Sequence, residues 1–131
     1  MSSEMLALAK TMMAHAYAPY SNFHVGAVVR GSNGKLYGGC NVENAAYPVG
    51  NCAEASAIAA MVGDGEPRIV EALVMGPEGE LCTPCGACRQ RLREFAGVDL
   101  PIHLADPTGV KQTVTLGELL PMSFGPAHLG K

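Results

Sequence analysis

The sequence predicts an α/β fold with a mixed sheet of about five strands flanked by helices. Two features carry this prediction. Segments with helical spacing of apolar residues alternate with short apolar or β-branched runs, and an Asn-Gly turn joins two of those runs. Because 131 residues are too few for two independent cores, residues 1–131 are expected to form one domain. Folding would bury about two-thirds of the extended chain's surface, which is enough for a core without disulfide bonds.

The first third of the chain predicts one helix followed by a β-hairpin. Apolar side chains recur at helical spacing in Glu4–His15, and the proline-containing segment Tyr17–Asn22 is expected to be a loop. Strands are predicted at Val25–Arg30 and Lys35–Cys40. The Ser-Asn-Gly sequence at 32–34 predicts the turn between them, because Asn-Gly readily adopts the positive φ angles that tight hairpins require.

The middle of the chain predicts a helix and a strand after an irregular segment. Asn41–Gly50 contains Pro and Gly and has no periodic pattern. Asn51 is expected to cap a helix over Cys52–Val62, which Gly63 ends. The apolar, β-branched run Ile69–Met75 then predicts a strand.

The last third predicts a second helix, two more strands and a short helix. The second helix is expected to begin at Pro84 or Cys85, since proline is favoured in an opening turn, and to end at Phe95. The strands are expected at Pro101–Ala105 and Val110–Leu116, on either side of an Asp-Pro-Thr-Gly turn. A short helix at 117–120 then precedes a Pro- and Gly-rich tail.

The composition excludes several classes of protein. Hydrophobic residues make up 48% of the chain and charged residues 16%, which excludes intrinsic disorder. The net charge of -3 offers no basic surface to a polymeric nucleic acid or an anionic membrane. The low fraction of charged residues is consistent with a surface that a partner subunit covers, and equally with a core that is rich in Ala and Gly. With no secretion signal and no apolar stretch long enough to span a bilayer, a cytoplasmic location is expected.

The five cysteines predict a metal site, because an odd number favours metal binding in a reducing compartment over a disulfide framework. Cys85 and Cys88 are three residues apart, which places both sulfur atoms on one face of a helix. Cys52 lies in the first turn of the other predicted helix. If the two helix starts face each other, three thiolates converge and leave a fourth position for water, as in catalytic zinc sites. One Zn²⁺ per chain is therefore expected.

Other interpretations of the same cysteines stay open at this point. With Cys82, the run C-x2-C-x2-C is typical of part of an iron–sulfur motif, although Leu92 stands where the fourth cysteine is needed. A closed structural zinc site of Cys52, Cys82, Cys85 and Cys88 is another alternative, and it would make the chain a non-catalytic zinc-stabilised module. Cys52 by itself would most often be a small buried hydrophobic residue.

Glu54 is the candidate catalytic group. It follows Cys52 by two residues, and beside a zinc-activated water its carboxyl would serve as a proton shuttle. A glutamate on a helix is otherwise most often a solvated surface residue.

With these motifs, the chain resembles the small homotetrameric cytidine deaminases of pyrimidine salvage over nearly its whole length. The resemblance rests on Cys52-Ala53-Glu54 and Pro84-Cys85-Gly86-Ala87-Cys88, which follow the motifs of the zinc nucleobase deaminases. Further segments carry it as well: Tyr-Ala-Pro-Tyr-Ser-Asn-Phe at 17–23, Val-Gly-Ala at 25–27, Gly-Cys-Asn-Val-Glu-Asn-Ala at 39–45, Cys-Arg-Gln at 88–90 and Glu-Leu-Leu-Pro at 118–121.

The resemblance implies a three-layer cytidine-deaminase-like fold and a role for each matching residue. It implies Zn²⁺ held by Cys52, Cys85 and Cys88, with Glu54 as general acid and base. Substrate contacts are implied for Asn41 and Glu43 at the ribose hydroxyls, Phe23 against the pyrimidine and the backbone around Ala53 at the base edge. It also implies a homotetramer in which Tyr47 and Phe124 contribute to a neighbouring subunit's active site.

The implied activity is hydrolytic deamination of cytidine and deoxycytidine to uridine and deoxyuridine, with release of ammonia. One departure bears on it: many relatives have Arg directly after the Cys-Ala-Glu triplet, where this chain has Ala55. Three thiolates on a divalent ion leave one negative charge uncompensated. Either the helix N-termini and Arg89 balance it, or the zinc-bound water is less acidic than in those relatives. Related deaminases of nucleoside antibiotics also lack that arginine, so a modified nucleoside is the alternative substrate.

Overall fold

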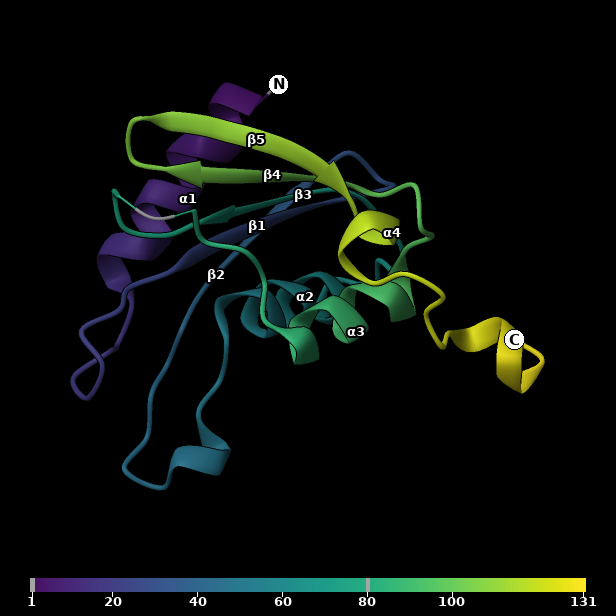
Figure 1. Ribbon diagram of the computed structural model, residues 1–131, viewed down its shortest axis with the longest axis horizontal. Coiled ribbons are helices and arrows are strands. Elements are labelled where there is room, and N and C mark those ends of the chain that lie inside the picture. Colours follow the sequence, from purple (N-terminus) through teal and green to yellow (C-terminus); the bar gives the residue numbers. More distant parts are fainter. Residues whose placement is uncertain (1, 80) are drawn as a thin grey trace.

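The computed structural model describes residues 2–79 and 81–131, which build a five-stranded sheet with helices on both faces (Figure 1). The strand order is β2-β1-β3-β4-β5; only β3 and β4 run parallel, and the other neighbours are antiparallel. The predicted mixed sheet is therefore confirmed. The helices and strands are α1 Ser2–His15, β1 Gly26–Gly31, β2 Leu36–Cys40, α2 Ala53–Gly63, β3 Ile69–Met75, α3 Gly86–Phe95, β4 Pro101–Asp106, β5 Gly109–Thr115 and α4 Leu116–Leu119, with single 3-10 turns at η1 Tyr47–Val49 and η2 Pro126–Leu129.

Two apolar cores, one on each face of the sheet, produce three layers. On one face α1 packs its buried Met5 and Ala9 against Val28, Leu73 and Met75 of the central strands. On the other face α2 and α3 pack on the sheet through a second set of buried residues, which includes Ala57, Ile58, Met61, Leu92, Ile102 and Leu104. Alternation along a strand explains the division, because successive side chains point to opposite faces. The three-layer prediction is confirmed.

The β1–β2 hairpin turns where the sequence predicts, at Asn33 and Gly34. Gly34 has a φ of +86°, which an L side chain adopts only with strain. The other predicted elements are also present, and their ends differ from the prediction by at most two residues. Within the described residues, no helix has the length and apolar character needed to cross a membrane.

The start of α2 differs from the prediction in a way that matters for the site. Asn51 does not cap the helix: its backbone pairs with Val42 in a short bridge, and Cys52 takes the N-cap position. Similarly, Pro84 lies outside α3, whose N-cap is Cys85. An N-cap residue must have extended dihedral angles, and both cysteines do. Each helix thus begins directly after a cysteine.

Gly39 of β2 lets α2 lie close to the sheet. A Cβ atom at this position would be 2.4 Å from the backbone nitrogen of Ala57 and 2.5 Å from the carbonyl oxygen of Ala53. The Ser56 hydroxyl adds a hydrogen bond from α2 to the carbonyl oxygen of Cys40, at 3.1 Å. These contacts fix the first turns of α2 against β2, and with them the position of Cys52 and its neighbours.

Candidate zinc site and adjoining pocket

Three cysteine sulfur atoms converge where the N-termini of α2 and α3 meet. The Sγ atoms of Cys52, Cys85 and Cys88 all lie within 4.8 Å of one another. Cys52 and Cys85 are the N-cap residues of the two helices, and Cys88 lies in the first turn of α3. Cys82 is not part of this cluster among the described residues, so the structure does not support the four-cysteine alternative. The triad that the sequence predicts is thereby assembled.

The donor set fits a zinc ion. Three soft sulfur donors with room for a further ligand are the chemistry that zinc prefers in catalytic sites. Burial raises the pKa of the Cys52 and Cys88 thiols above the ordinary value, so both need a neighbouring cation to stay ionised. Burial acts in the same direction on Cys85, but hydrogen bonds from the backbone of Cys88 and neighbouring groups outweigh it and lower the pKa of that thiol. All five cysteines are free thiols, as metal binding requires.

Glu54 is buried beside this cluster, and the surface-residue interpretation is wrong for it. Only 5% of the residue is exposed, although it is the second residue of α2. Burial raises the pKa of its carboxyl, while a hydrogen bond with Cys88 and the charge of Arg91 act in the opposite direction. A carboxyl that is sheltered from water and not locked into an ion pair can both accept and donate a proton.

A pocket of about 240 Å³ opens in front of the cluster and is lined by three of the residues for which the resemblance implies substrate contacts. Besides Cys52, Glu54 and Cys85, its lining includes Phe23, Val25, Asn41, Ala53, Cys82 and Thr83. Phe23 is 48% exposed, so it is not the core residue that an isolated phenylalanine usually is. The structure brings Phe23, Asn41 and Ala53 together with Cys52, Cys85 and Glu54 in one pocket lining.

Asn41 and Glu43 hold the loop that carries Phe23. The Asn41 amide donates to the Phe23 carbonyl oxygen at 2.8 Å and accepts from the Val25 backbone at 2.9 Å. The Glu43 carboxylate accepts hydrogen bonds from the backbone nitrogens of Tyr20 and Ser21, at 2.9 and 3.1 Å, and from the Ser21 hydroxyl. These bonds lower the pKa of Glu43, with the Ser21 hydroxyl the largest cause, and keep it ionised.

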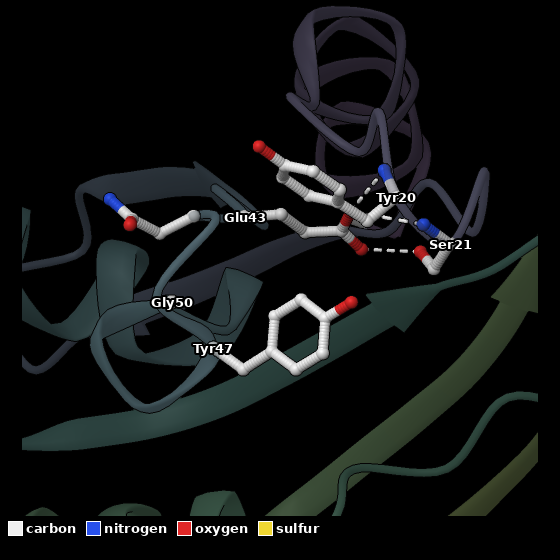
Figure 2. A pocket seen from close by; sticks show the side chains of 6 residues that line it. Tyr20, Ser21, Glu43, Tyr47 and Gly50 are labelled. Carbon is white, nitrogen blue, oxygen red and sulfur yellow. Dashed lines mark hydrogen bonds between the residues drawn. The ribbon is translucent and has the colours of Figure 1, made fainter.

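Figure 2 shows Glu43 in a second pocket, of about 340 Å³, with the rings of Tyr20 and Tyr47 beside its carboxylate. The two rings meet edge to face, with centroids 6.1 Å apart. Tyr47 is 76% exposed and lines this pocket but not the pocket of the cysteines. Ser21 donates to Glu43 through both its backbone nitrogen and its hydroxyl, a role that the sequence does not predict.

Phe124 lies far along the chain and does not line the cysteine pocket of its own subunit. Its ring is 56% exposed and stacks on His128 with 4.9 Å between centroids. The ring therefore does not pack in the core of this chain. The carbonyl oxygen of Phe124 accepts a hydrogen bond from the Gln90 side chain at 2.8 Å, which ties the tail to α3.

Comparison with known proteins agrees with this geometry. A family model described as the cytidine and deoxycytidylate deaminase zinc-binding region matches residues 1–103. The chain belongs to the cytidine deaminase family. It is 39% identical over 127 residues to the cytidine deaminase of Sporosarcina psychrophila, a match that covers 96% of this chain and 93% of that protein.

Solved structures of cytidine deaminases share the fold. The crystal structure from Burkholderia pseudomallei superposes with a TM-score of 0.88 at 37% identity, covering 95% of this chain and 99% of that one. The enzyme from Mycobacterium leprae gives 0.79 at 40% identity, covering 92% and 98%. As a cytidine deaminase family member, the chain carries the family's zinc-binding region, and its cluster of three cysteines is able to hold the metal.

Arg89, a candidate for balancing the thiolate charge, forms its hydrogen bonds away from the sulfur atoms. The Arg89 guanidinium donates to the carbonyl oxygens of Pro84 and Leu119, both at 2.8 Å, and to the Thr83 hydroxyl. It thus joins the loop before α3 to α4. Arg91 instead reaches the cluster, and its Nη1 atom lies 3.4 Å from Cys88 Sγ. The sequence signal for Arg91 is its position three residues after Cys88, on the same helix face.

Proposed function

We propose that the chain, as one domain of residues 1–131, hydrolyses cytidine and deoxycytidine to uridine and deoxyuridine with release of ammonia, as a step of pyrimidine salvage. The observation that carries this proposal is the burial of Glu54 in a pocket where three converging cysteines and Phe23 also lie. A proton-transfer group, a metal-ligand triad and an aromatic surface for a flat base are thus combined in one small cavity.

We assign the zinc ligands to Cys52, Cys85 and Cys88. When bound there, the ion supplies Lewis acidity that makes a water molecule nucleophilic at neutral pH. The positive ends of α2 and α3 both point at the sulfur atoms, because two of the three cysteines are N-cap residues. Both helix dipoles therefore stabilise thiolate ligands.

Glu54 carries the protons in the proposed reaction. Its carboxylate takes a proton from the attacking water and delivers it to N3 of the pyrimidine as the C4–O bond forms. The same carboxyl then takes the remaining hydroxyl proton and passes it to the exocyclic amino group. The C4–N bond breaks, ammonia leaves and the C4 carbonyl of uridine is formed, so one water is consumed for each ammonia released.

The sugar is placed by the residues beside the cysteine pocket. An amide such as Asn41 can donate to a ribose hydroxyl, and the Glu43 carboxylate can accept from one. Both side chains already fix the 20–25 loop, so a substrate contact would bind to preorganised groups. No lysine or arginine is among the described residues that line either pocket, which favours a neutral nucleoside over a nucleotide.

The active form is proposed to be a homotetramer whose subunits complete one another's sites. The segments that contain η1 and η2 project away from the sheet (Figure 1), and each exposes an aromatic ring, Tyr47 and Phe124 respectively. Apolar rings at projecting, solvent-exposed positions are typical of protein interfaces. A cytoplasmic location is proposed as well, because five free thiols fit a reducing compartment.

The test is an absorbance assay of cytidine turnover by the purified protein, with a zinc determination on the same sample. Glu54→Gln keeps the size and hydrogen bonding of the side chain but cannot shuttle protons, so turnover should fall by at least about 10²–10⁴-fold. Zinc content should stay at one per chain. A Glu54→Gln variant with near-normal turnover would assign the shuttle to another group. A wild-type protein that binds zinc but does not deaminate cytidine would favour a modified nucleoside as the substrate, or a non-catalytic role.

A further inference from the structure

The cysteine cluster concentrates negative charge in a partly buried place. Three ionised thiolates exceed the charge of one divalent ion, and the Glu54 carboxylate lies in the same pocket. Charge of one sign at such a site costs free energy unless a cation lies nearby. Among the described residues, Arg91 is the cation whose side chain contacts one of these sulfur atoms.

Helix geometry explains how Arg91 reaches the cluster. It lies three residues after Cys88 on α3, so both side chains lie on the same face of the helix. Side chains on a helix tilt toward its N-terminus, which directs the long Arg91 side chain back toward the cysteine end. The Arg91 Nη1 atom accordingly donates to Cys88 Sγ at 3.4 Å, a normal length for a hydrogen bond to sulfur.

The other two arginines of α3 are engaged elsewhere. Arg89 binds the carbonyl oxygens of Pro84 and Leu119. Arg93 donates to the Ser123 hydroxyl at 2.9 Å and lies near the Ala96 carbonyl oxygen. Both therefore hold the loops that surround α3. Of the three arginines of this helix, Arg91 is the one that contacts a cysteine sulfur atom.

We propose that Arg91 is a positioning residue for the metal: its guanidinium orients Cys88 and balances the charge of the thiolate cluster, and so strengthens zinc binding. This inference rests on the proposed ligand set. Groups that hydrogen-bond to a metal ligand fix its orientation and moderate its charge, and losing one typically weakens metal affinity by about 10–100-fold.

The test starts from the zinc-loaded protein and measures the zinc dissociation constant by competition with a chromophoric chelator. Arg91→Ala should weaken zinc binding about tenfold or more, and Arg91→Lys should retain part of the affinity because it keeps the charge. Arg91 is solvent-exposed, so its removal leaves the core intact. Arg68→Ala is the matched control, because it removes an exposed arginine whose side chain has no hydrogen bond to the described residues, and it should leave the constant unchanged.

A spectroscopic readout separates a direct effect on sulfur from a general loss of stability. In the cobalt-substituted protein, Arg91→Ala should shift the thiolate-to-metal charge-transfer band, since the hydrogen bond withdraws electron density from Cys88. Rescue gives a further check. Ala55 stands three residues after Cys52, the same spacing that relates Arg91 to Cys88, so Ala55→Arg should restore zinc affinity in the Arg91→Ala background.

The outcomes separate this inference from the proposed function. If the wild-type protein holds one zinc and Arg91→Ala leaves both the dissociation constant and the cobalt spectrum unchanged, the role of Arg91 is overturned and the ligand set stands. If the wild-type protein binds no zinc, the ligand set itself fails. A tenfold loss with Arg91→Ala but not with Arg68→Ala supports the inference.

Discussion

Gly39 of β2 lets the first turns of α2 lie close to the strand, and its replacement by alanine should disturb the zinc site without altering any ligand. The added Cβ atom would meet backbone atoms of Ala57 and Ala53, the nearer at 2.4 Å. That is about 1 Å short of the 3.4 Å at which ordinary contacts begin. Because both obstacles are backbone atoms, no side-chain rotation can relieve the clash, and α2 must move away from the sheet.

The expected size of the effect follows from this displacement. Overpacking a core costs about 1–3 kcal/mol, and an obstacle made of backbone atoms places Gly39→Ala at the upper end. For a chain of 131 residues this lowers the melting temperature by about 10 °C. A shift of about 1 Å in Cys52 and Glu54, which adjoin Ala53, should reduce kcat/KM by about 10²-fold, since catalytic geometry tolerates little misplacement.

Thermal unfolding, zinc content and deamination rate, measured on the same preparations, test this reasoning. Gly63→Ala is the matched control, because this glycine lies in α2, the helix that Gly39 contacts, and a Cβ there meets nothing within 4 Å. Its stability should be unchanged or slightly higher, since alanine favours a helix. Gly38→Ala should be intermediate, because its Cβ meets the flexible Met12 side chain. A Gly39→Ala protein with wild-type melting temperature and rate would refute the argument.

Three further predictions concern the metal, the subunit interface and acid stability. Cys85→Ala should lose most of its zinc by metal analysis, and full zinc retention or bound iron would contradict the ligand assignment. Phe124→Ala should raise KM for cytidine by at most about ten- to hundredfold with zinc content intact, because burying an aromatic ring contributes a few kcal/mol. An unchanged KM, or an active monomer in sedimentation, would exclude a role across subunits. Burial raises the pKa of Glu71, but hydrogen bonds from His103 and Arg30 outweigh burial and hold this pKa below the ordinary value of 4.5. The stability that the ionised carboxylate contributes is therefore present above pH 4.5 and is lost as the pH falls further. In urea unfolding, Glu71→Gln should therefore lose less stability than wild type between pH 7 and about pH 4, and equal losses would assign the acid sensitivity to other groups.

The sequence alone determined the features that depend on neighbouring residues. Helical and alternating apolar patterns located the helices and strands to within two residues, and Asn33-Gly34 located the hairpin turn. The pairing of Cys85 with Cys88 also followed from the sequence, because a spacing of three residues places both on one helix face, whereas the approach of Cys52 depended on how the two helices pack. The burial of Glu54 did not follow from its position at a helix start, although its place two residues after Cys52 and the resemblance to cytidine deaminases both predicted a proton-transfer role.

Only the tertiary structure decided which polar groups meet across long sequence separations. The sequence offered Arg89 as one candidate charge partner of the thiolates, but Arg89 donates to the Leu119 carbonyl oxygen, 30 residues away, and Arg91 contacts Cys88. Glu43 likewise holds the backbone of Tyr20, 23 residues before it. A hydrogen bond between distant segments depends on how the helices and loops pack around the sheet, and a guanidinium binds whichever acceptor that packing brings within its reach. Local periodicity contains no information about that choice.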